Sequence, residues 1–270
     1  MKDTQHATSN SEVERVIDKL KEFYAANSQI KESHGLSHVL AVYNHARNAV
    51  ACHEPPLSPK AATEVLIAAL LHDVDDEKYF PLKEDGENNF PNALKIMEQV
   101  RITDKQCSTV SIDSVLFMID LVSCSKNGNS VPEIIQENEE FYRLIPRWAD
   151  RIEAVGKEGV VRCYRYNQER NFPLSSPESP RPSTLEQLWA FASPERFQLY
   201  QSSGGNSADM ISHYYDKLLH IACPPSNIVR NAYLERKLLG SAVELIEVCF
   251  RFGRSGVVDE DYIQQLEKSL

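Results

Sequence analysis

Two histidines and two aspartates, far apart in the sequence, are of the residue types that bind divalent metal ions. His38 lies in HGLSHVLAVYNHA, and Asp150 lies in RWADRIEAVG. His72 and Asp73 form a doublet in AALLHDVDDEKYF, at the end of a very apolar run. These settings place all four side chains near the interior, where an uncompensated carboxylate is costly. One ion would satisfy all four; we expect Mn²⁺ or Mg²⁺, while Fe²⁺, Co²⁺ and Zn²⁺ also suit these ligand types.

The helix predicted around His38 carries two further histidines on the same side. At about 100° per residue, His34, His38 and His45 fall within roughly 40° of one another. Val39 and Val42 belong to the neighbouring apolar stripe, so the imidazoles lie at the edge of a surface that faces the core. We interpret His45 as a structural residue.

The same segments resemble the HD-domain phosphohydrolases, whose pattern H…HD…D binds one catalytic divalent metal. HGLSHVLAVYNHA is similar to the first motif of that family, and LLHDVDD carries the doublet. ADRIEAVGKEGVVRCYRY and the later HYYDKLL are similar to segments of a bacterial-type, single-metal subgroup. The resemblance extends over residues 34–217 and implies an α-helical fold that hydrolyses a phosphate ester or anhydride, most often of a nucleotide. The metal ligands that it implies are His38, His72, Asp73 and Asp150.

The chain departs from the subgroup at two points. Gly35 stands where many members have an aspartate directly after the first histidine. Members with two metal ions carry extra histidines between the doublet and the last aspartate, whereas the histidine that follows His72 here is His213. We therefore expect one metal ion and no chemistry that needs two, such as oxidative ring cleavage.

Three residues near the doublet and the first helix are the catalytic candidates. A bound ion would lower the pKa of water and polarise a phosphoryl group. Asp76 and Glu77 follow the doublet closely enough to act as general base or acid for that water, although a solvated acidic run is an equal interpretation. His34 could give a proton to the leaving group or orient a ligand.

The candidate substrate contacts are mostly cationic or small polar residues. A lysine after the doublet could clamp a phosphate, and an asparagine in FPNALKIM could contact the substrate or cap its own helix. The polar loop SCSKNGNS would suit phosphate or base recognition, while an arginine beside a buried carboxylate is often simply paired with it. The residues concerned are Lys78, Asn92, Ser125, Lys126, Arg151 and Lys217.

The elements that must position these side chains are predicted to be helices. Apolar residues recur at the helical spacing, and no window alternates as a half-buried strand does, which predicts an all-α, HD-domain-like bundle of many helices. Ser9 and Glu12 suggest a capping box before the first helix. The predicted helices cover residues 12–26, 36–52, 59–72, 91–100, 104–122, 138–155, 208–221, 227–252 and 260–270.

Two segments interrupt the helical pattern. Ser123–Ser130 is a predicted polar loop, and Gln168–Ser183, with four prolines, is a predicted exposed insertion. We favour a single domain over residues 1–270, with a core at about residues 12–222 and a C-terminal helical extension at residues 226–270. Two domains joined by the proline-rich segment fit the pattern about as well.

Composition limits the class of partner. Lys and Arg total 29 against 39 Asp and Glu, a formal net charge of −10, which disfavours nucleic-acid polymers and anionic membranes. The apolar run Val65–Leu71 is too short to cross a bilayer, and the polar residues 1–10 do not resemble a signal peptide. We expect a small phosphorylated substrate, reduced cysteines and a cytoplasmic location, with the nucleus also open.

Two other functions remain open at this stage. The chain could be an inactive HD-type protein that binds a nucleotide or a partner without turnover. It could also be a plain helical scaffold in which the four candidate ligands form a hydrogen-bonded network in the core.

Overall fold

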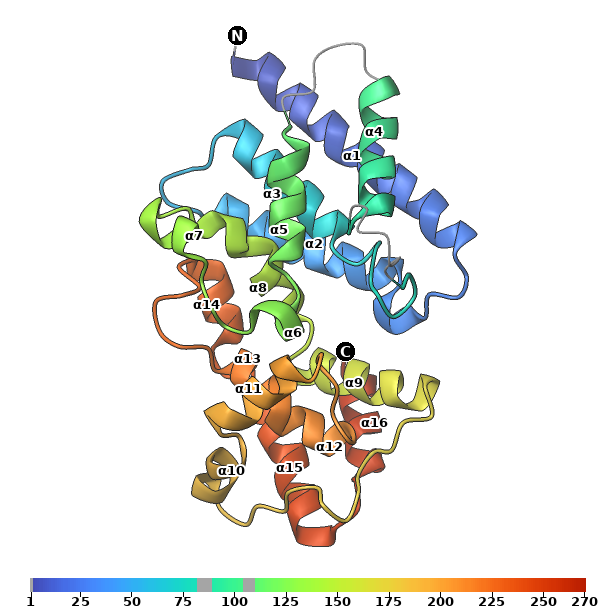
Figure 1. Ribbon diagram of the computed structural model, residues 1–270, viewed down its shortest axis with the longest axis vertical. Helices are drawn as coiled ribbons and strands as arrows, with labels where there is room; N and C mark the ends of the chain where they lie inside the picture. The colour runs from blue at the N-terminus through green and yellow to red at the C-terminus, as the bar shows by residue number, and fades with distance from the viewer. Residues whose placement is uncertain (1, 82–88, 104–109) are drawn as a thin grey trace. The chain divides into compact units, whose positions relative to one another are not determined.

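The computed structural model describes residues 2–81, 89–103 and 110–270, and for residues 2–11 and 101–103 it describes the backbone alone. Every regular element in these ranges is helical, which confirms the predicted all-α class (Figure 1). The cysteine at position 107 and the predicted start of a helix at residue 104 lie outside the described residues. None of the helices described is both long enough and apolar enough to cross a membrane.

The chain forms two compact units, and unit 1 carries the predicted ligands. It comprises Met1–Val122, Glu139–Asp150 and Asn231–Tyr233. Within it, α3 packs against α1, α2 and α5, and α4 packs against α1. The elements of this unit are α1 (Lys2–Ala26), η1 (Glu32–His34), α2 (Leu36–Ala51), α3 (Pro59–Leu71), α4 (Pro91–Thr103), α5 (Ile112–Asp120), η2 (Phe141–Leu144) and α8 (Ile145–Ile152) as far as Asp150.

Helix α3 lies at the centre of unit 1 because it is apolar on almost every side. The Ser58 hydroxyl accepts a hydrogen bond from the Ala61 backbone N–H, and Pro59 occupies the first turn, so the helix begins where the sequence predicts. Its buried residues run almost without interruption from Thr63 to Leu71. A helix that is apolar all round belongs in a core. It delivers His72 directly at its C-terminal end.

Unit 2 comprises Ser123–Asn138, Arg151–Arg230 and Leu234–Leu270. In this unit α9 packs against α15 and α16, and η3, a π-helical turn, packs against α11 and α12. Its elements are α6 (Cys124–Asn127), α7 (Glu133–Glu137), α9 (Gly156–Glu169), α10 (Leu185–Phe191), α11 (Pro194–Ser202), α12 (Met210–His213), η3 (Tyr214–Leu218), α13 (Leu219–Ala222), α14 (Ala232–Leu238) from Leu234 onward, α15 (Val243–Ser255) and α16 (Glu260–Lys268).

Several predicted boundaries differ from those observed. Helix α1 begins at Lys2 and not at Glu12, so Ser9 and Glu12 lie inside the helix and do not cap it. The predicted loop at Ser123–Ser130 contains the short helix α6, and α9, α10 and α11 were not predicted. The expected single domain stays a prediction, because two compact units can still fold as one domain.

The proline-rich segment lacks regular structure, as predicted, but it is not wholly exposed. The backbone N–H groups of Met210 and Ile211 donate to the carbonyl oxygens of Pro173 and Leu174, at 3.1 Å each. The buried carboxylate of Asp209 accepts hydrogen bonds from two serines of the segment and from the first turn of α12. The donors are Ser176 Oγ, Ser179 Oγ, Ser212 Oγ and the Ser212 backbone N–H.

Replacing Asp209 tests whether this carboxylate ties the segment down. Asp209→Ala removes an N-cap and leaves buried donors unpaired, so we expect the free energy of unfolding to fall by about 2–4 kcal/mol. Urea unfolding followed by circular dichroism measures it. Glu178→Ala, an exposed carboxylate of the same segment, is the control and should change stability by less than about 0.5 kcal/mol. Equal effects of the two substitutions would contradict the assignment.

Candidate metal centre

His72 has one ring nitrogen committed to the backbone and the other free to bind. Its Nδ1 lies 2.9 Å from the carbonyl oxygen of Ala69, one turn earlier in α3. A carbonyl oxygen only accepts hydrogen bonds, so Nδ1 carries the proton and donates. The buried Nε2 has no hydrogen-bond partner among the described residues. Metal-binding histidines are commonly fixed in this way, with the second nitrogen bonded to a backbone carbonyl.

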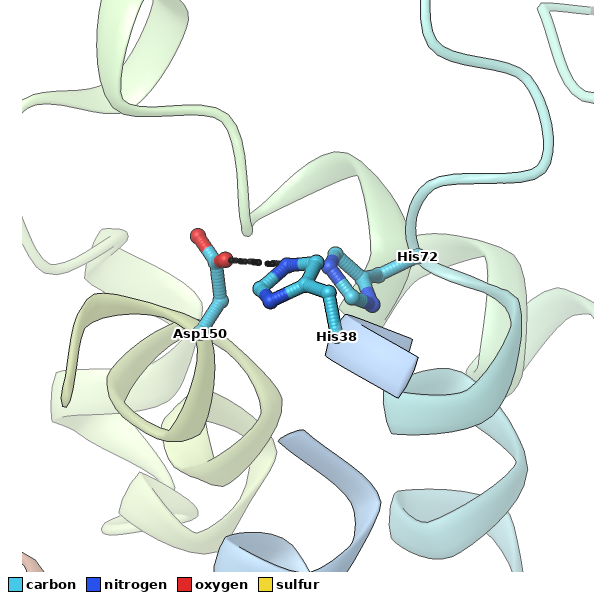
Figure 2. A group of neighbouring side chains, drawn as sticks. All are labelled: His38, His72 and Asp150. Atoms are coloured by element: carbon cyan, nitrogen blue, oxygen red, sulfur yellow. Dashed lines mark ion pairs between the residues drawn. The ribbon is translucent and has the colours of Figure 1, made fainter. Parts of the chain in front are cut away.

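His38 and Asp150 present their donor atoms to the same place. His38 Nε2 lies 3.3 Å from Asp150 Oδ1, and His72 Nε2 lies 3.7 Å from the same oxygen. Figure 2 shows the two imidazoles and the carboxylate converging from three separate segments of the chain. His38 comes from the buried face of α2, and Asp150 comes from α8. All three residues belong to unit 1.

The spacing of these donor atoms is compatible with a single metal ion. Donor atoms bound to one ion at about 2.0–2.2 Å lie about 3.0–3.6 Å apart in tetrahedral or octahedral geometry. One donor atom from each of His38, His72 and Asp150 lies within 4.8 Å of the others. Because His72 Nε2 carries a lone pair and faces a carboxylate without a hydrogen bond, a cation between them would relieve their repulsion. This group can therefore hold a metal ion.

Asp73 lies beside the group but faces each histidine with a different oxygen. Its Oδ1 lies 3.4 Å from His72 Nε2, and its Oδ2 lies 3.5 Å from His38 Nε2. Oδ2 is buried and has no hydrogen-bond partner among the described residues. The tightest group of donors contains three residues and not the four expected, so Asp73 as the fourth ligand stays a prediction.

A buried arginine helps to fix the helix that carries Asp150. Arg147, one turn earlier in α8, has no exposed surface, and its Nε donates to the carbonyl oxygen of Leu121 at 2.7 Å. Trp148 and Ala149 are also completely buried. These contacts leave Asp150 as the partly exposed residue at this end of α8, where its carboxylate can reach the two histidines.

His34, Asp76 and Lys78 form a second cluster, which we call the lysine cluster. Lys78 Nζ lies 3.0 Å from His34 Nε2 and 3.3 Å from Asp76 Oδ2, and Asp76 Oδ1 accepts the Lys78 backbone N–H. An ammonium group only donates, so His34 Nε2 accepts, and its protonated Nδ1 donates to Ser33 Oγ at 3.1 Å. The structure thus brings three of the candidates from catalysis and substrate binding together, while Glu77 is exposed.

Asn92 and Asp75 join the turn after His72 to helix α4. The Asn92 side-chain amide donates to the Val74 carbonyl oxygen at 3.0 Å. Asp75 accepts the backbone N–H groups of Asn92 and Ala93, at 2.9 Å each, and so caps α4 from another segment. Burial raises the pKa of Asp75, and these hydrogen bonds oppose the shift. We did not predict this role of Asp75; it lies far before α4 in the sequence, so no pattern at the helix start indicates it.

The remaining candidates lie in unit 2. The buried guanidinium of Arg151 donates to Asn129 Oδ1 and to the Gly128 carbonyl oxygen, so it holds the loop that contains α6. Ser125 Oγ lies 3.1 Å from Ser123 Oγ, and Lys126 is exposed at the end of α6. Lys217 is half-buried in η3, near Cys163. Their contact with a substrate stays a prediction.

Comparison with known proteins shows which family the chain belongs to but does not indicate an activity. An uncharacterized protein of Acanthamoeba polyphaga mimivirus is 36% identical to this chain over 226 residues, which are 81% of this chain and 88% of that protein. No family model matches the chain. A crystal structure of a Lactobacillus plantarum protein is similar with a TM-score of 0.57 at 18% identity, covering 89% of this chain and 94% of that one. At that identity the likeness concerns the fold alone.

Substitution of the converging residues tests the metal centre directly. We expect the purified protein to bind a divalent ion, and His72→Ala or Asp150→Ala to weaken binding by at least about a hundredfold, since even residues behind the ligands contribute about 10–100-fold. Calorimetric titration with Mn²⁺ measures the affinity. His45→Ala is the matched control, because His45 lies on α2 and its Nδ1 is 2.8 Å from the Tyr233 hydroxyl.

Thermal unfolding gives a second measurement of the same site. An ion that binds only the folded protein stabilises it by about 2.7 kcal/mol at 100 times its dissociation constant. Mn²⁺ should therefore raise the melting temperature of the wild type and of His45→Ala, but not that of Asp150→Ala. Equal responses in all three proteins would contradict this metal centre.

Proposed function

The chain belongs to the family of the mimivirus protein, and we propose that it is a phosphohydrolase that depends on a divalent metal ion. Its substrate would be a phosphate ester or anhydride of a nucleotide or of a related small phosphorylated metabolite. The observation that carries the proposal is the convergence of His38, His72 and Asp150, with Asp73 beside them. The H…HD…D pattern on which this expectation rests uses the same four residues.

The residues of the centre would hold the ion and leave space for the substrate. His38, His72 and Asp150 supply one donor atom each, and the adjacent Asp73 could supply a fourth. Mn²⁺ or Mg²⁺ commonly takes six ligands, so two positions would stay available for water and a phosphoryl oxygen. When bound, such an ion lowers the pKa of water and polarises the phosphoryl group.

The lysine cluster would bind and orient the phosphoryl group. The Lys78 ammonium is only partly covered and is shared between a neutral imidazole and a carboxylate. A phosphate oxygen can compete for this ammonium because a hydrogen bond between two charged groups is stronger than one to a neutral nitrogen. Asp76 is the remaining acceptor in the cluster and could take a proton from the attacking water.

The electrostatics favour a small substrate. The formal net charge of −10 would repel a polyanion over the whole surface, whereas a small phosphate needs cations only at the site. The ion and Lys78 would supply those cations. A cytoplasmic location suits such a substrate and belongs to the same proposal.

Phosphate release tests the proposed activity. We expect the wild type to release phosphate or pyrophosphate from at least one member of a nucleotide panel that includes mono- and triphosphates and cyclic nucleotides, with Mn²⁺, Mg²⁺ or Co²⁺. Asp73→Asn should reduce the rate by at least about a hundredfold, because it removes a charge that faces both histidines. A folded Asp73→Asn variant that keeps its turnover would contradict the assignment.

A substitution in the lysine cluster separates substrate binding from metal binding. Lys78→Met should raise KM by about tenfold or more, since a hydrogen bond between charged groups contributes about 1.5–3 kcal/mol, and should leave Mn²⁺ affinity unchanged. Lys60→Met is the matched control, an exposed lysine of unit 1 whose Nζ lies 3.9 Å from Glu64. If the wild type binds nucleotides tightly but hydrolyses none of the panel, the chain is a binding protein and the proposed activity is wrong.

A further inference from the structure

Tyr24 has a buried hydroxyl that nothing in the described structure satisfies. The residue lies near the C-terminal end of α1, and its Oη has no hydrogen-bond partner among the described residues. Its ring packs edge-on against Phe23 with centroids 5.4 Å apart, and Phe23 in turn packs against Phe80 at 5.8 Å. The phenol is therefore held in place by ring packing, while its polar end stays unused. A buried polar group without a partner calls for an explanation, such as a ligand that it binds.

The surroundings of the hydroxyl are acidic. Burial raises the pKa of Tyr24 far above its ordinary value, and the carboxylates of Asp73 and Asp76 and the Tyr79 hydroxyl raise it further. The phenol thus keeps its proton and is available as a hydrogen-bond donor. Both aspartates belong to the sites described above, Asp73 to the metal centre and Asp76 to the lysine cluster.

An unused acceptor lies in the same part of unit 1. Asp73 Oδ2 is buried and has no hydrogen-bond partner in the described residues, and no hydrogen bond joins it to Tyr24. A metal ion bound to Asp73 would satisfy this oxygen, whereas the Tyr24 hydroxyl would still need an oxygen that accepts its hydrogen bond. A ligand bound next to the ion could present that oxygen.

We infer that Tyr24 is a substrate-binding residue whose hydroxyl donates a hydrogen bond to an oxygen of the phosphoryl group. The inference rests on the proposed phosphohydrolase function. A phosphoryl group near Asp73 and Asp76 needs donors to offset the negative charge of these carboxylates. A neutral phenol supplies one without adding a charge that the metal ion would repel.

Tyr24→Phe is the test, because it removes the hydroxyl alone. The variant should bind Mn²⁺ as the wild type does, whereas the Mn²⁺-loaded variant should bind inorganic phosphate about ten- to a hundredfold more weakly, as measured by calorimetry. KM for the hydrolysed nucleotide should rise by a similar factor. Tyr43→Phe is the control; Tyr43 lies on α2 with its ring against the Arg47 guanidinium, and its substitution should change none of these values.

The ligand-free protein gives a readout that a structural tyrosine would not share. Because the hydroxyl makes no hydrogen bond in the described structure, Tyr24→Phe should melt at the same temperature as the wild type or higher. A lower melting temperature, or unchanged phosphate affinity in a variant that binds Mn²⁺ normally, would overturn the inference and leave the proposed function intact. A wild type that binds Mn²⁺ but neither binds phosphate nor hydrolyses any nucleotide would overturn both.

Discussion

The hydrogen bond from His72 Nδ1 to the Ala69 carbonyl oxygen is the interaction on which the candidate centre depends. It uses a carbonyl at the end of α3, where the helix itself leaves acceptors unsatisfied. By taking the only proton of a neutral imidazole, it leaves a lone pair on Nε2, aimed at carboxylates. The resulting arrangement is unfavourable by itself, and a cation relieves it. This one hydrogen bond to the backbone therefore leaves the histidine at the end of the helix able to bind an ion.

Helix α3 gives that bond its rigidity, since its apolar side chains are buried on all sides in unit 1. The turn after the helix is fixed independently, because Asp75 caps α4 with two backbone hydrogen bonds and Asn92 returns one to Val74. Along this turn, residues that hold the fold therefore alternate with residues of the metal centre and of the lysine cluster. A substitution at Asp75 would disturb both at once, so its effects on stability and on binding could not be separated.

The sequence predicted the helical class because periodicity is a local property. Burial at the edge of apolar faces made His38, His72 and Asp150 candidates, and the resemblance to the H…HD…D pattern implied that they converge. Hydrogen bonds between segments that are far apart in the sequence leave no periodic pattern from which they could be predicted. The charge of Arg151 and the side-chain amide of Asn92 suggested contacts with a substrate. In the structure, Arg151 donates to the Gly128 carbonyl oxygen and Asn92 donates to that of Val74. Helices α10 and α11 are too short for a periodic pattern, although Thr184 and Ser193 cap them. Tyr24 was missed because a tyrosine on an amphipathic helix normally belongs to the core.

The π-helical turn at Tyr214–Leu218 has a consequence for how this chain can vary. Such a turn contains one residue more than the α-helix does, so deleting one residue within it would restore ordinary winding and leave the next helical segment at nearly the same rotation. His220, which follows the turn, would then keep its stacking position over Phe197, where the rings are 4.6 Å apart, whereas Asp216 inside the turn would shift relative to Arg196. The length of this segment is therefore less strictly constrained than that of an ordinary helix, and related chains should tolerate the loss of a single residue there.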